Sequence, residues 1–382
     1  MKYGSYLYSD DRQFGFKKTM GCCNAIFAFR NLINYFNERG SNVFMASLDA
    51  SKAFDRVNHF KLYVSLMKRN IPMVFLNVVI NWYSKMNVIV RWNNSLSAMM
   101  RVRSGVRQGG VLSPYLFNVY ADVFINNIVT SSVGCHIGHT CMACLMYADD
   151  MLLISASLAG LQELMNECVR TSNEICLKFN EKKSHCIIIG PHQHTYVANV
   201  VLDGTPLMWA NSIKYLGIDL IAGSSFDVDL DQVRRKFFMS TNSILKHCSG
   251  VSEPIKLYLC ESYCLPVLSY ALESLQLGTT VIRKLNVYWN SVYRKIFSYK
   301  PWESVRDVMK CLGKKNLEFI YYERKLCFLH SMLLSDNDVI RCIMSGYVYS
   351  SEYIELCKKC ELSAQENVSN IKRSLYEKFC GT

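Results

Sequence analysis

The stretch that decides the fold is Leu145-Met146-Tyr147-Ala148-Asp149-Asp150-Met151-Leu152-Leu153-Ile154, in which two adjacent carboxylates interrupt an apolar run. Short apolar segments on both sides of a polar pair predict two buried strands that meet at a tight turn. Carboxylates held close together in a partly dry site repel each other unless a cation neutralises them. The stretch therefore predicts an acidic hairpin tip that binds a hard cation such as Mg²⁺. Taken alone, it also fits a surface turn with a capping aspartate.

A third carboxylate follows an apolar stretch nearer the N-terminus. Residues 43 to 48 predict a short buried strand, and Asp49 comes next in Ser47-Leu48-Asp49-Ala50-Ser51-Lys52-Ala53-Phe54-Asp55. Two metal ions about 3.5–4 Å apart activate a 3′-hydroxyl and stabilise a leaving pyrophosphate when carboxylates from separate elements hold them. Asp49 and Asp149 meet that requirement, with Asp150 as the supporting acid.

A glycine-rich loop lies between these two acidic segments, in Gly105-Val106-Arg107-Gln108-Gly109-Gly110-Val111-Leu112-Ser113-Pro114. Glycines allow a backbone to approach a ligand closely. Arg107 and Gln108 can donate hydrogen bonds to phosphate or sugar oxygens, and Pro114 fits the first turn of a helix. A plain loop-to-helix junction is the alternative interpretation of this segment by itself.

Composition narrows the class of protein. The chain has 382 residues, half of them apolar, with 43 Lys and Arg against 31 Asp and Glu, a net charge of +12. This apolar content excludes a disordered tail or linker. No run of 18 apolar residues is present, which excludes a transmembrane helix, and Met1-Lys2-Tyr3-Gly4-Ser5 lacks the apolar core of a signal peptide. The positive charge favours nucleic acid as the partner.

The cysteine content has a simpler interpretation. The 17 cysteines are odd in number, irregular in spacing and mostly set in apolar runs, so we expect reduced thiols that pack as small hydrophobes. His136, His139, Cys141 and Cys144 offer zinc as an alternative. That segment leads into a strand pattern, where alternate side chains point to opposite faces and four ligands do not converge.

Periodicity predicts the order of the elements. A strand pair over 88–92 and 98–102 is expected around Asn93-Asn94, and two further strands over 186–189 and 213–218. Helices are expected over 22–38, 51–69, 73–86, 113–129 and 158–178. Long helical patterns take over after about residue 223. Residues 226–330 hold 16 Lys and Arg against 10 Asp and Glu, which predicts either a phosphate-facing surface or an ordinary solvated helix face.

Segments along nearly the whole chain resemble the reverse transcriptases of non-LTR (LINE-type) retrotransposons. The three palm motifs of that family resemble Leu48–Val57, Arg107–Pro114 and Tyr147–Asp150. Further segments in the same order resemble the end of the fingers motif (Gln13-Phe14-Gly15-Phe16), the following Asn-x-x-Lys motif (Asn180-Glu181-Lys182-Lys183-Ser184), the primer-grip hairpin (Tyr215-Leu216-Gly217) and the thumb (Leu265–Tyr270 and Arg294–Phe297).

The resemblance implies a role for each matched residue. Asp49, Asp149 and Asp150 would bind two Mg²⁺ ions, with Mn²⁺ as an alternative, and Lys183 would be a general acid towards pyrophosphate. Residues that would contact the incoming nucleotide are Ala50, Phe54, Arg107, Gln108 and Gly109. The primer grip would consist of Tyr215, Leu216 and Gly217. Phe54 would be the aromatic steric gate that favours dNTPs; core packing is its alternative, as a solvated loop position is for Lys183.

The resemblance also implies fold, partners and location. It implies an α+β right-hand polymerase: a palm with an antiparallel sheet and packed helices, a helical thumb and incomplete fingers. The expected domains are partial fingers over 1–42, palm over 43–222, thumb over 223–334 and a helical tail over 335–382. The implied activity is RNA-directed DNA synthesis from dNTPs on an RNA template and DNA primer, inside the cell and in the nucleus, without a membrane.

The resemblance leaves one alternative function and two other polymerase classes to consider. The family's proteins are much longer and carry a nuclease, so a truncated, catalytically inactive nucleic-acid-binding remnant is the alternative function. A group II intron-type enzyme shares the Asp-Asp turn, but no maturase-like segment follows the thumb. An RNA-dependent RNA polymerase would not be expected to carry an aromatic gate at Phe54.

Overall fold

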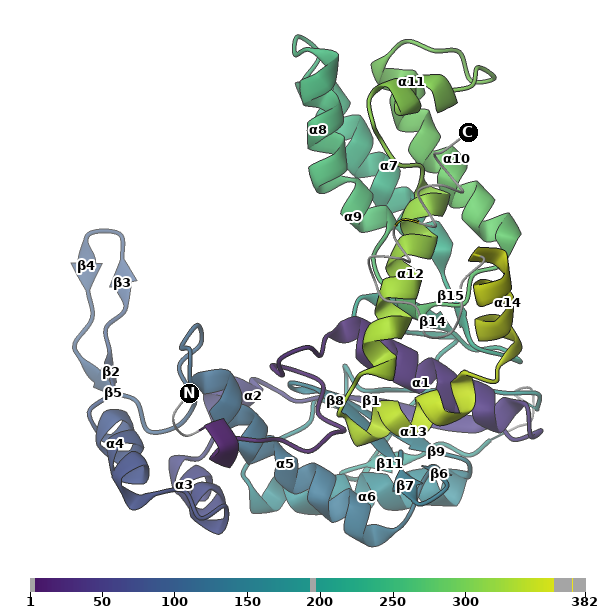
Figure 1. Ribbon diagram of the computed structural model, residues 1–382. Coiled ribbons are helices and arrows are strands. Elements are labelled where there is room, and N and C mark those ends of the chain that lie inside the picture. The colour runs from purple at the N-terminus through teal and green to yellow at the C-terminus, as the bar shows by residue number, and fades with distance from the viewer. Residues whose placement is uncertain (1–3, 193–196, 361–372, 374–382) are drawn as a thin grey trace. The chain divides into compact units, whose positions relative to one another are not determined.

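The structure is a computed structural model that describes residues 4–192, 197–360 and 373. The chain divides into two compact units. The first comprises Met1–Ala25 and Leu32–Asp227, and the second comprises Ile26–Asn31 and Val228–Thr382. The elements of both units are labelled in Figure 1.

An antiparallel four-stranded sheet forms the centre of the first unit. Its strands are β1 (Val43–Asp49), β8 (Cys144–Tyr147), β9 (Asp150–Ser155) and β10 (His185–Ile189). Their order is β10-β1-β9-β8, and β1 pairs with both β9 and β10. Residues 151–155 of β9 are all buried, so both faces of the sheet are covered at this strand. The sheet therefore places the ends of β1 and β9 side by side.

Helices pack against this sheet and against one another. α6 (Leu158–Glu174) contacts β1 and β9, and α5 (Ser113–Ser131) packs on α6. α3 (His59–Lys68) packs on α5 and on α4 (Met73–Ser84). α6 begins at a serine N-cap, Ser157, whose hydroxyl accepts a hydrogen bond from the Gly160 N–H at 3.1 Å. The buried faces of α3, α5 and α6 form one hydrophobic core with the sheet.

Short elements complete the first unit. Its other helices are η1 (Gly4–Tyr6), α1 (Cys22–Asn37, of which 26–31 belong to the second unit) and α2 (Ala53–Arg56). Its other strands are β2 (Asn87–Val88), β3 (Arg91–Trp92), β4 (Ser95–Leu96), β5 (Met100–Arg101), β6 (His136–Ile137), β7 (Thr140–Cys141), β11 (Val201–Leu202), β12 (Thr205–Pro206), β13 (Ser212–Tyr215) and β14 (Ile218–Ile221). β15 (Asp227–Val228) spans the boundary between the units.

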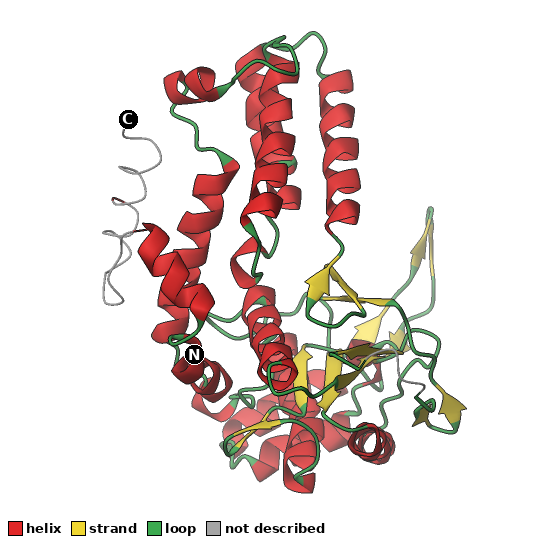
Figure 2. Cartoon of the chain, turned by 90° about the vertical axis from the view of Figure 1, so that its right-hand side faces the viewer, coloured by secondary structure: helices red, strands yellow, loops and turns green. Residues whose placement is uncertain are grey.

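The second unit consists of helices. They are α7 (Leu230–His247), α8 (Glu253–Tyr263), α9 (Leu265–Leu268), η2 (Leu272–Ser274), α10 (Thr279–Ile296), α11 (Arg306–Cys311), α12 (Leu317–Leu333), α13 (Asp338–Tyr347) and α14 (Ser351–Cys360). Figure 2 shows the long helices of this unit side by side, and α7, α8 and α10 contact one another. Trp289 is buried among them, with its ring centroid 5.7 Å from that of Tyr293. α12 packs on α10 and α13.

The helix expected over 51–69 was wrong as a single element. The chain leaves the helical region at Val57, and α3 begins after Asn58. The Asn58 side chain accepts a hydrogen bond from the Lys61 N–H at 3.1 Å. The backbone N–H of Asn58 donates to the hydroxyl of Tyr120 at 3.2 Å. Asparagine is a preferred N-cap, so the residue that looked like part of one helix starts a second one.

Three other predicted elements differ from the structure in their bounds. The strand expected over 213–218 is the hairpin β13–β14, because Leu216 and Gly217 both have positive φ angles, of 44° and 84°. Two consecutive left-handed residues make the tight turn that suits a β-hairpin. The helix expected over 158–178 ends at Glu174, and the strand pair around Asn93-Asn94 consists of two short ladders, β2–β5 and β3–β4.

The predicted α+β fold class is confirmed, since antiparallel strands and packed helices make up the described chain. The fingers, palm and thumb boundaries stay predictions. The predicted tail over 335–382 lies partly outside the described residues, at 361–372 and 374–382. Among the described helices, none is long and apolar enough to cross a membrane. The described cysteines are free thiols.

Candidate active site

The three predicted carboxylates lie at the ends of neighbouring strands. Asp49 is the last residue of β1 and stands opposite Asp150, the first residue of β9. Asp149 lies in the turn between β8 and β9, next to Ala148, which has a φ angle of 58°. Directly opposed residues of an antiparallel pair project from the same face of the sheet. The fold thus brings together carboxylates that are far apart in the sequence.

The electrostatics of this group show how close the charges lie. Burial, and then the charge of Asp49, raise the pKa of Asp149. Burial, and then the charges of Asp149 and Asp49, raise the pKa of Asp150. A raised carboxyl pKa means that the ionised form is disfavoured at this location, so a cation bound here would relieve the repulsion.

The carboxylates fit a divalent cation by the chemistry of their oxygens. Hard ions such as Mg²⁺ and Mn²⁺ prefer carboxylate ligands, commonly one or two per ion, and complete their shell with water and phosphate oxygens. Among the described residues, no three His, Cys, Asp or Glu side chains are already gathered as a metal-binding group. The metal-binding role of the three carboxylates therefore stays a prediction.

The Asn180-to-Ser184 segment is fastened to the end of β1. The Asn180 N–H donates to the Asp49 carbonyl at 2.8 Å, and the Asp49 N–H donates to the Ser184 hydroxyl at 3.3 Å. The ammonium of Lys183 lies 3.9 Å from Oδ2 of Asp49, and its side chain is 69% exposed. The predicted general acid therefore stands beside a predicted metal ligand, with freedom to move.

The glycine-rich loop lies against α2, which follows Asp49. Val106 N–H donates to the Phe54 carbonyl at 2.8 Å, and Gln108 Nε2 donates to Oδ1 of Asp55 at 3.1 Å. Gly105 has a φ of +92°, and a Cβ built there would lie 2.8 Å from the Asp55 carbonyl oxygen, so no side chain fits. Residues 107 to 109 are exposed. The structure brings the first two predicted motifs into direct contact.

Phe54 packs between two other aromatic rings. Its ring stacks on Phe117 with centroids 4.5 Å apart and an interplanar angle of 10°, and it meets Phe16 edge-on at 6.1 Å. These contacts hold the ring in one orientation. The neighbouring Ala50 forms a bridge with Phe179, which aligns this segment with the sheet.

The predicted primer grip forms the turn of β13–β14. Leu216 and Gly217 occupy the tip, and Tyr215 is buried at the end of β13. Burial, and then the charge of Asp150, raise the pKa of Tyr215. This third predicted segment therefore lies within electrostatic reach of the carboxylates.

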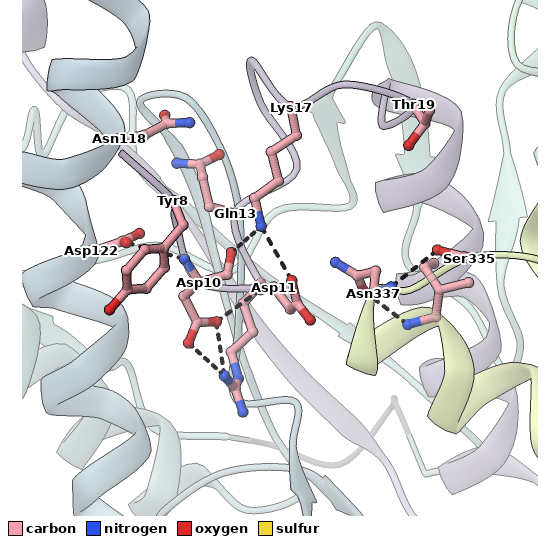
Figure 3. A network of polar contacts seen from close by, with 12 residues as sticks. Tyr8, Asp10, Asp11, Gln13, Lys17, Thr19, Asn118, Asp122, Ser335 and Asn337 are labelled. Atoms are coloured by element: carbon pink, nitrogen blue, oxygen red, sulfur yellow. Dashed lines mark hydrogen bonds and ion pairs between the residues drawn. The ribbon is translucent and has the colours of Figure 1, made fainter. Parts of the chain in front are cut away.

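Sequence reasoning missed the contact between the N-terminal segment and the acidic turn. Gln13 is fully buried, and its side chain forms hydrogen bonds with the backbone of Ala148. Gln13 lay in a segment that resembles the fingers motif, and the only local signal was a glutamine flanked by Arg12 and Phe14. Figure 3 shows Gln13 within the polar network that also includes Asp10 and Asn118.

The described part of the chain does not gather His136, His139, Cys141 and Cys144 into a group of three or more that could hold a metal ion. His136 pairs with Cys141 across the β6–β7 hairpin, and Cys141 and Cys144 are buried. Burial raises the pKa of the Cys144 thiol well above its ordinary value, which disfavours the thiolate that zinc needs.

Residues 8–220, more than half of the chain, match the family described as reverse transcriptase (RNA-dependent DNA polymerase). The chain belongs to the reverse transcriptase family. All predicted palm motifs lie inside the matched part of the reverse transcriptase domain.

The similar proteins come from non-LTR retrotransposable elements, which confirms the resemblance. The domain is 29% identical over 231 residues to the Pol polyprotein of element R2DM from Drosophila melanogaster, covering 58% of this chain and 22% of that protein. It is 23% identical over 311 residues to the RNA-directed DNA polymerase of the Drosophila melanogaster mobile element jockey. That match covers 78% of this chain and 33% of the jockey protein. The chain thus spans between a fifth and a third of these relatives.

A solved structure of apo telomerase from Candida tropicalis also matches the domain. The aligned part covers 98% of this chain and 59% of the telomerase chain, at 13% sequence identity and with a TM-score of 0.46.

Proposed function

We propose that this chain is an RNA-directed DNA polymerase domain that adds dNTPs to a primer 3′-hydroxyl on an RNA template. The observation that carries the proposal is the meeting of Asp49, Asp149 and Asp150 at the ends of β1 and β9 in a reverse transcriptase domain. The chain spans part of its relatives' length, so the polymerase step is proposed for this domain alone.

Asp49 and Asp149 would hold two divalent ions, Mg²⁺ or Mn²⁺, with Asp150 in support. When bound, the ions would lower the pKa of the primer hydroxyl and stabilise charge on the leaving pyrophosphate. Lys183 would donate a proton towards that pyrophosphate, a role supported by its position 3.9 Å from Asp49. Family members use divalent metal ions in general, which supports the choice of cofactor.

Incoming nucleotide would bind where α2 and the glycine-rich loop meet. Arg107 and Gln108 are exposed donors on this loop, and the turn at Gly109 leaves the backbone accessible. Phe54 lies on α2 beside them, with its ring held by Phe117. A fixed aromatic ring below the sugar would exclude a 2′-hydroxyl by steric overlap.

Replacing Phe54 with valine is expected to raise the use of ribonucleotides relative to deoxynucleotides by about 10- to 100-fold. The shorter side chain would leave room for the 2′-hydroxyl, while the kcat/KM for dNTPs should change much less. Competition between dCTP and CTP on one template measures this ratio. Phe44→Val, which removes a ring from β1 that contacts Trp209 instead, is the matched control. An unchanged ratio in Phe54→Val would leave core packing as the role of Phe54.

A long acid-free segment supports nucleic acid as the partner. Residues 56–121 contain nine Lys and Arg and no Asp or Glu. In the described chain only Arg69 of these nine is ion-paired, with Asp122. The arm of residues 87–101, built from the β2–β5 and β3–β4 ladders, carries Arg91 on β3 and Arg101 on β5. It is exposed along its length, and Figure 1 shows it projecting from the region of α4. Unpaired cations on an exposed arm suit phosphate contacts.

Changing Arg101 and Arg103 together to serine is expected to reduce the slope of log binding constant against log salt by about 2 for a primer–template duplex. Each lost phosphate contact releases one counterion fewer. Fluorescence anisotropy at several salt concentrations gives the slope. The control changes Arg39 and Arg170, which are exposed but have local partners in Tyr35 and Glu167. Equal slopes for both double variants would place the nucleic acid elsewhere.

Primer extension on an RNA template tests the function directly. Wild-type chain should incorporate dNTPs with Mg²⁺ or Mn²⁺ and should stop when the metal is chelated. Salt-dependent nucleic-acid binding with background incorporation would instead support the catalytically inactive remnant. Incorporation that persists after complete metal removal would contradict the two-metal mechanism.

A further inference from the structure

Gln13 makes three hydrogen bonds around the acidic turn, although it lies far from that turn in the sequence. Its Nε2 donates to the Ala148 carbonyl at 3.2 Å, and its Oε1 accepts from the Ala148 N–H at 2.9 Å. The same Oε1 accepts from the Gly15 N–H at 2.9 Å. One side-chain amide therefore satisfies both polar groups of a single buried residue.

Ala148 has a backbone conformation that needs such support. It is a buried non-glycine residue with a φ of 58°, in the left-handed region that costs an L-residue about 1–2 kcal/mol. Its peptide groups precede Asp149 directly, so the orientation of this residue fixes the direction of the turn. Unpaired buried backbone groups at this point would favour a different turn conformation.

The segment that carries Gln13 is itself held firmly. Phe14 N–H donates to the Met146 carbonyl at 2.8 Å, and Met146 N–H donates to the Arg12 carbonyl at 2.8 Å. A Cβ built on Gly15 would lie 2.5 Å from the nitrogen of Ala148, so this approach is possible only for glycine. The segment thus runs as an extra strand-like support along β8.

Two anchors on α5 connect this segment to the helical core. Asn118 Nδ2 donates to the Gly15 carbonyl at 2.8 Å, and Oδ2 of Asp122 accepts from the Asp10 N–H at 3.1 Å (Figure 3). Asp122 is also paired with Arg69 at 2.6 Å. Asn118 and Gln13 therefore support the same segment, but only Gln13 contacts Ala148.

We propose that Gln13 is a positioning residue whose amide holds the Ala148 peptide and so aims Asp149 and Asp150 at the divalent cation. This proposal rests on the proposed function of those carboxylates. Gln13 contacts neither substrate nor ion, and it acts only through the turn. Its loss should weaken metal binding more than it weakens the fold.

The test compares Gln13→Met with Asn118→Ala. Methionine has nearly the shape of glutamine but forms none of the three hydrogen bonds, whereas Asn118→Ala removes an anchor of the same segment and leaves the amide–turn contact in place. Mn²⁺ binding to each chain is titrated by electron paramagnetic resonance, and thermal unfolding is followed in parallel. The Mg²⁺ concentration for half-maximal incorporation is measured on a primed RNA template.

We expect Gln13→Met to weaken Mn²⁺ binding and to raise the half-activating Mg²⁺ concentration by about tenfold. Asn118→Ala should lower the melting temperature comparably but leave both metal constants unchanged. Equal metal constants in wild type and Gln13→Met, or equal weakening in both variants, would overturn the proposal. So would a wild-type chain that binds no Mn²⁺.

The Mn²⁺ titration separates this proposal from the proposed function. A wild-type chain that binds Mn²⁺ but incorporates no dNTP would refute polymerase activity. The positioning role would then be decided by Mn²⁺ binding alone, because that measurement needs neither primer nor nucleotide.

Discussion

Changing Asp149 to asparagine is expected to reduce dNTP incorporation on a primed RNA template by about 1,000-fold or more, equivalent to about 4 kcal/mol of transition-state stabilisation. Asparagine keeps the size and the hydrogen-bonding shape of the side chain, so the turn between β8 and β9 should survive. What it removes is the negative charge that binds a divalent cation. Single-nucleotide incorporation rates, measured with Mg²⁺ and then with Mn²⁺, test this expectation.

The matched control is Asp203→Asn. Asp203 is an exposed aspartate in the turn between β11 and β12, in the same unit, and it also has a positive φ angle. Its replacement should leave incorporation within a factor of two of wild type. If Asp149→Asn kept incorporation within tenfold of wild type, Asp49 and Asp150 would have to hold the ions without it, and the assignment of Asp149 would be wrong.

The Asp149→Asn variant should still bind nucleic acid. The basic residues of the acid-free segment are unchanged in Asp149→Asn, so primer–template affinity should remain the same or rise slightly as a negative charge is lost. A variant that binds normally and does not incorporate would separate binding from catalysis. A parallel loss of both would indicate that the substitution disturbs the fold.

Much of the site could be predicted because its signals are local. The apolar runs that flank Asp149 and Asp150 define two strands and a turn without reference to the rest of the chain. The apolar stretch of residues 43–48 likewise predicts a strand that ends at Asp49. Asp49 stands opposite Asp150 because of the register of β1 and β9. No local pattern predicts this register, and the order of the motifs suggests it only through the family resemblance.

Other features depend on partners that no local pattern reveals. The sequence pattern places Asn58 inside one long helix. In the structure its side chain accepts from the Lys61 N–H and its backbone N–H donates to Tyr120, so it is an N-cap. Gln13 is an ordinary polar residue in the sequence, and its role depends on a peptide group 135 positions away. Side chains that satisfy buried backbone groups are selected by tertiary context, so their function is visible only once the fold is known.

A buried charge cluster in the second unit is another feature that no local sequence pattern reveals. Arg30 of α1, Lys325 of α12 and Glu352 of α14 meet in a nearly dry site, where Arg30 is 1% exposed, Lys325 2% and Glu352 13%. Arg30 Nη2 lies 3.0 Å from Oε2 of Glu352, while Lys325 pairs with Oε1 and donates to the Leu275 carbonyl at 2.5 Å. A single carboxylate therefore compensates two buried cations.

The ionisation of this cluster follows from its charges. Burial opposes ionisation of Glu352, but the charges of Arg30 and Lys325 outweigh it and lower its pKa. Burial, and then the charge of Arg30, lower the pKa of Lys325 to about 8. Without Glu352, the two cations would repel each other with no counter-charge, and the pKa of Lys325 would fall further.

Glu352→Gln is expected to lower the free energy of unfolding of the second unit by about 3–5 kcal/mol, because it leaves buried cations uncompensated. Urea unfolding, followed by hydrogen exchange of the α12 and α14 amides, resolves this unit from the first. Glu355→Gln, an exposed position on the same helix, should change the free energy by less than about 0.5 kcal/mol.

Removing one cation should restore part of the loss. In the double variant Glu352→Gln with Lys325→Met, the buried site carries only the charge of Arg30, and Tyr321 offers its ring beside the methionine, as it now does to the ammonium at 5.7 Å. The effects of the two substitutions should therefore be non-additive by more than about 1 kcal/mol. Additive effects, or a Glu352→Gln variant as stable as Glu355→Gln, would mean that water or backbone groups already compensate the cations, and that the cluster contributes little to holding α14 against α12.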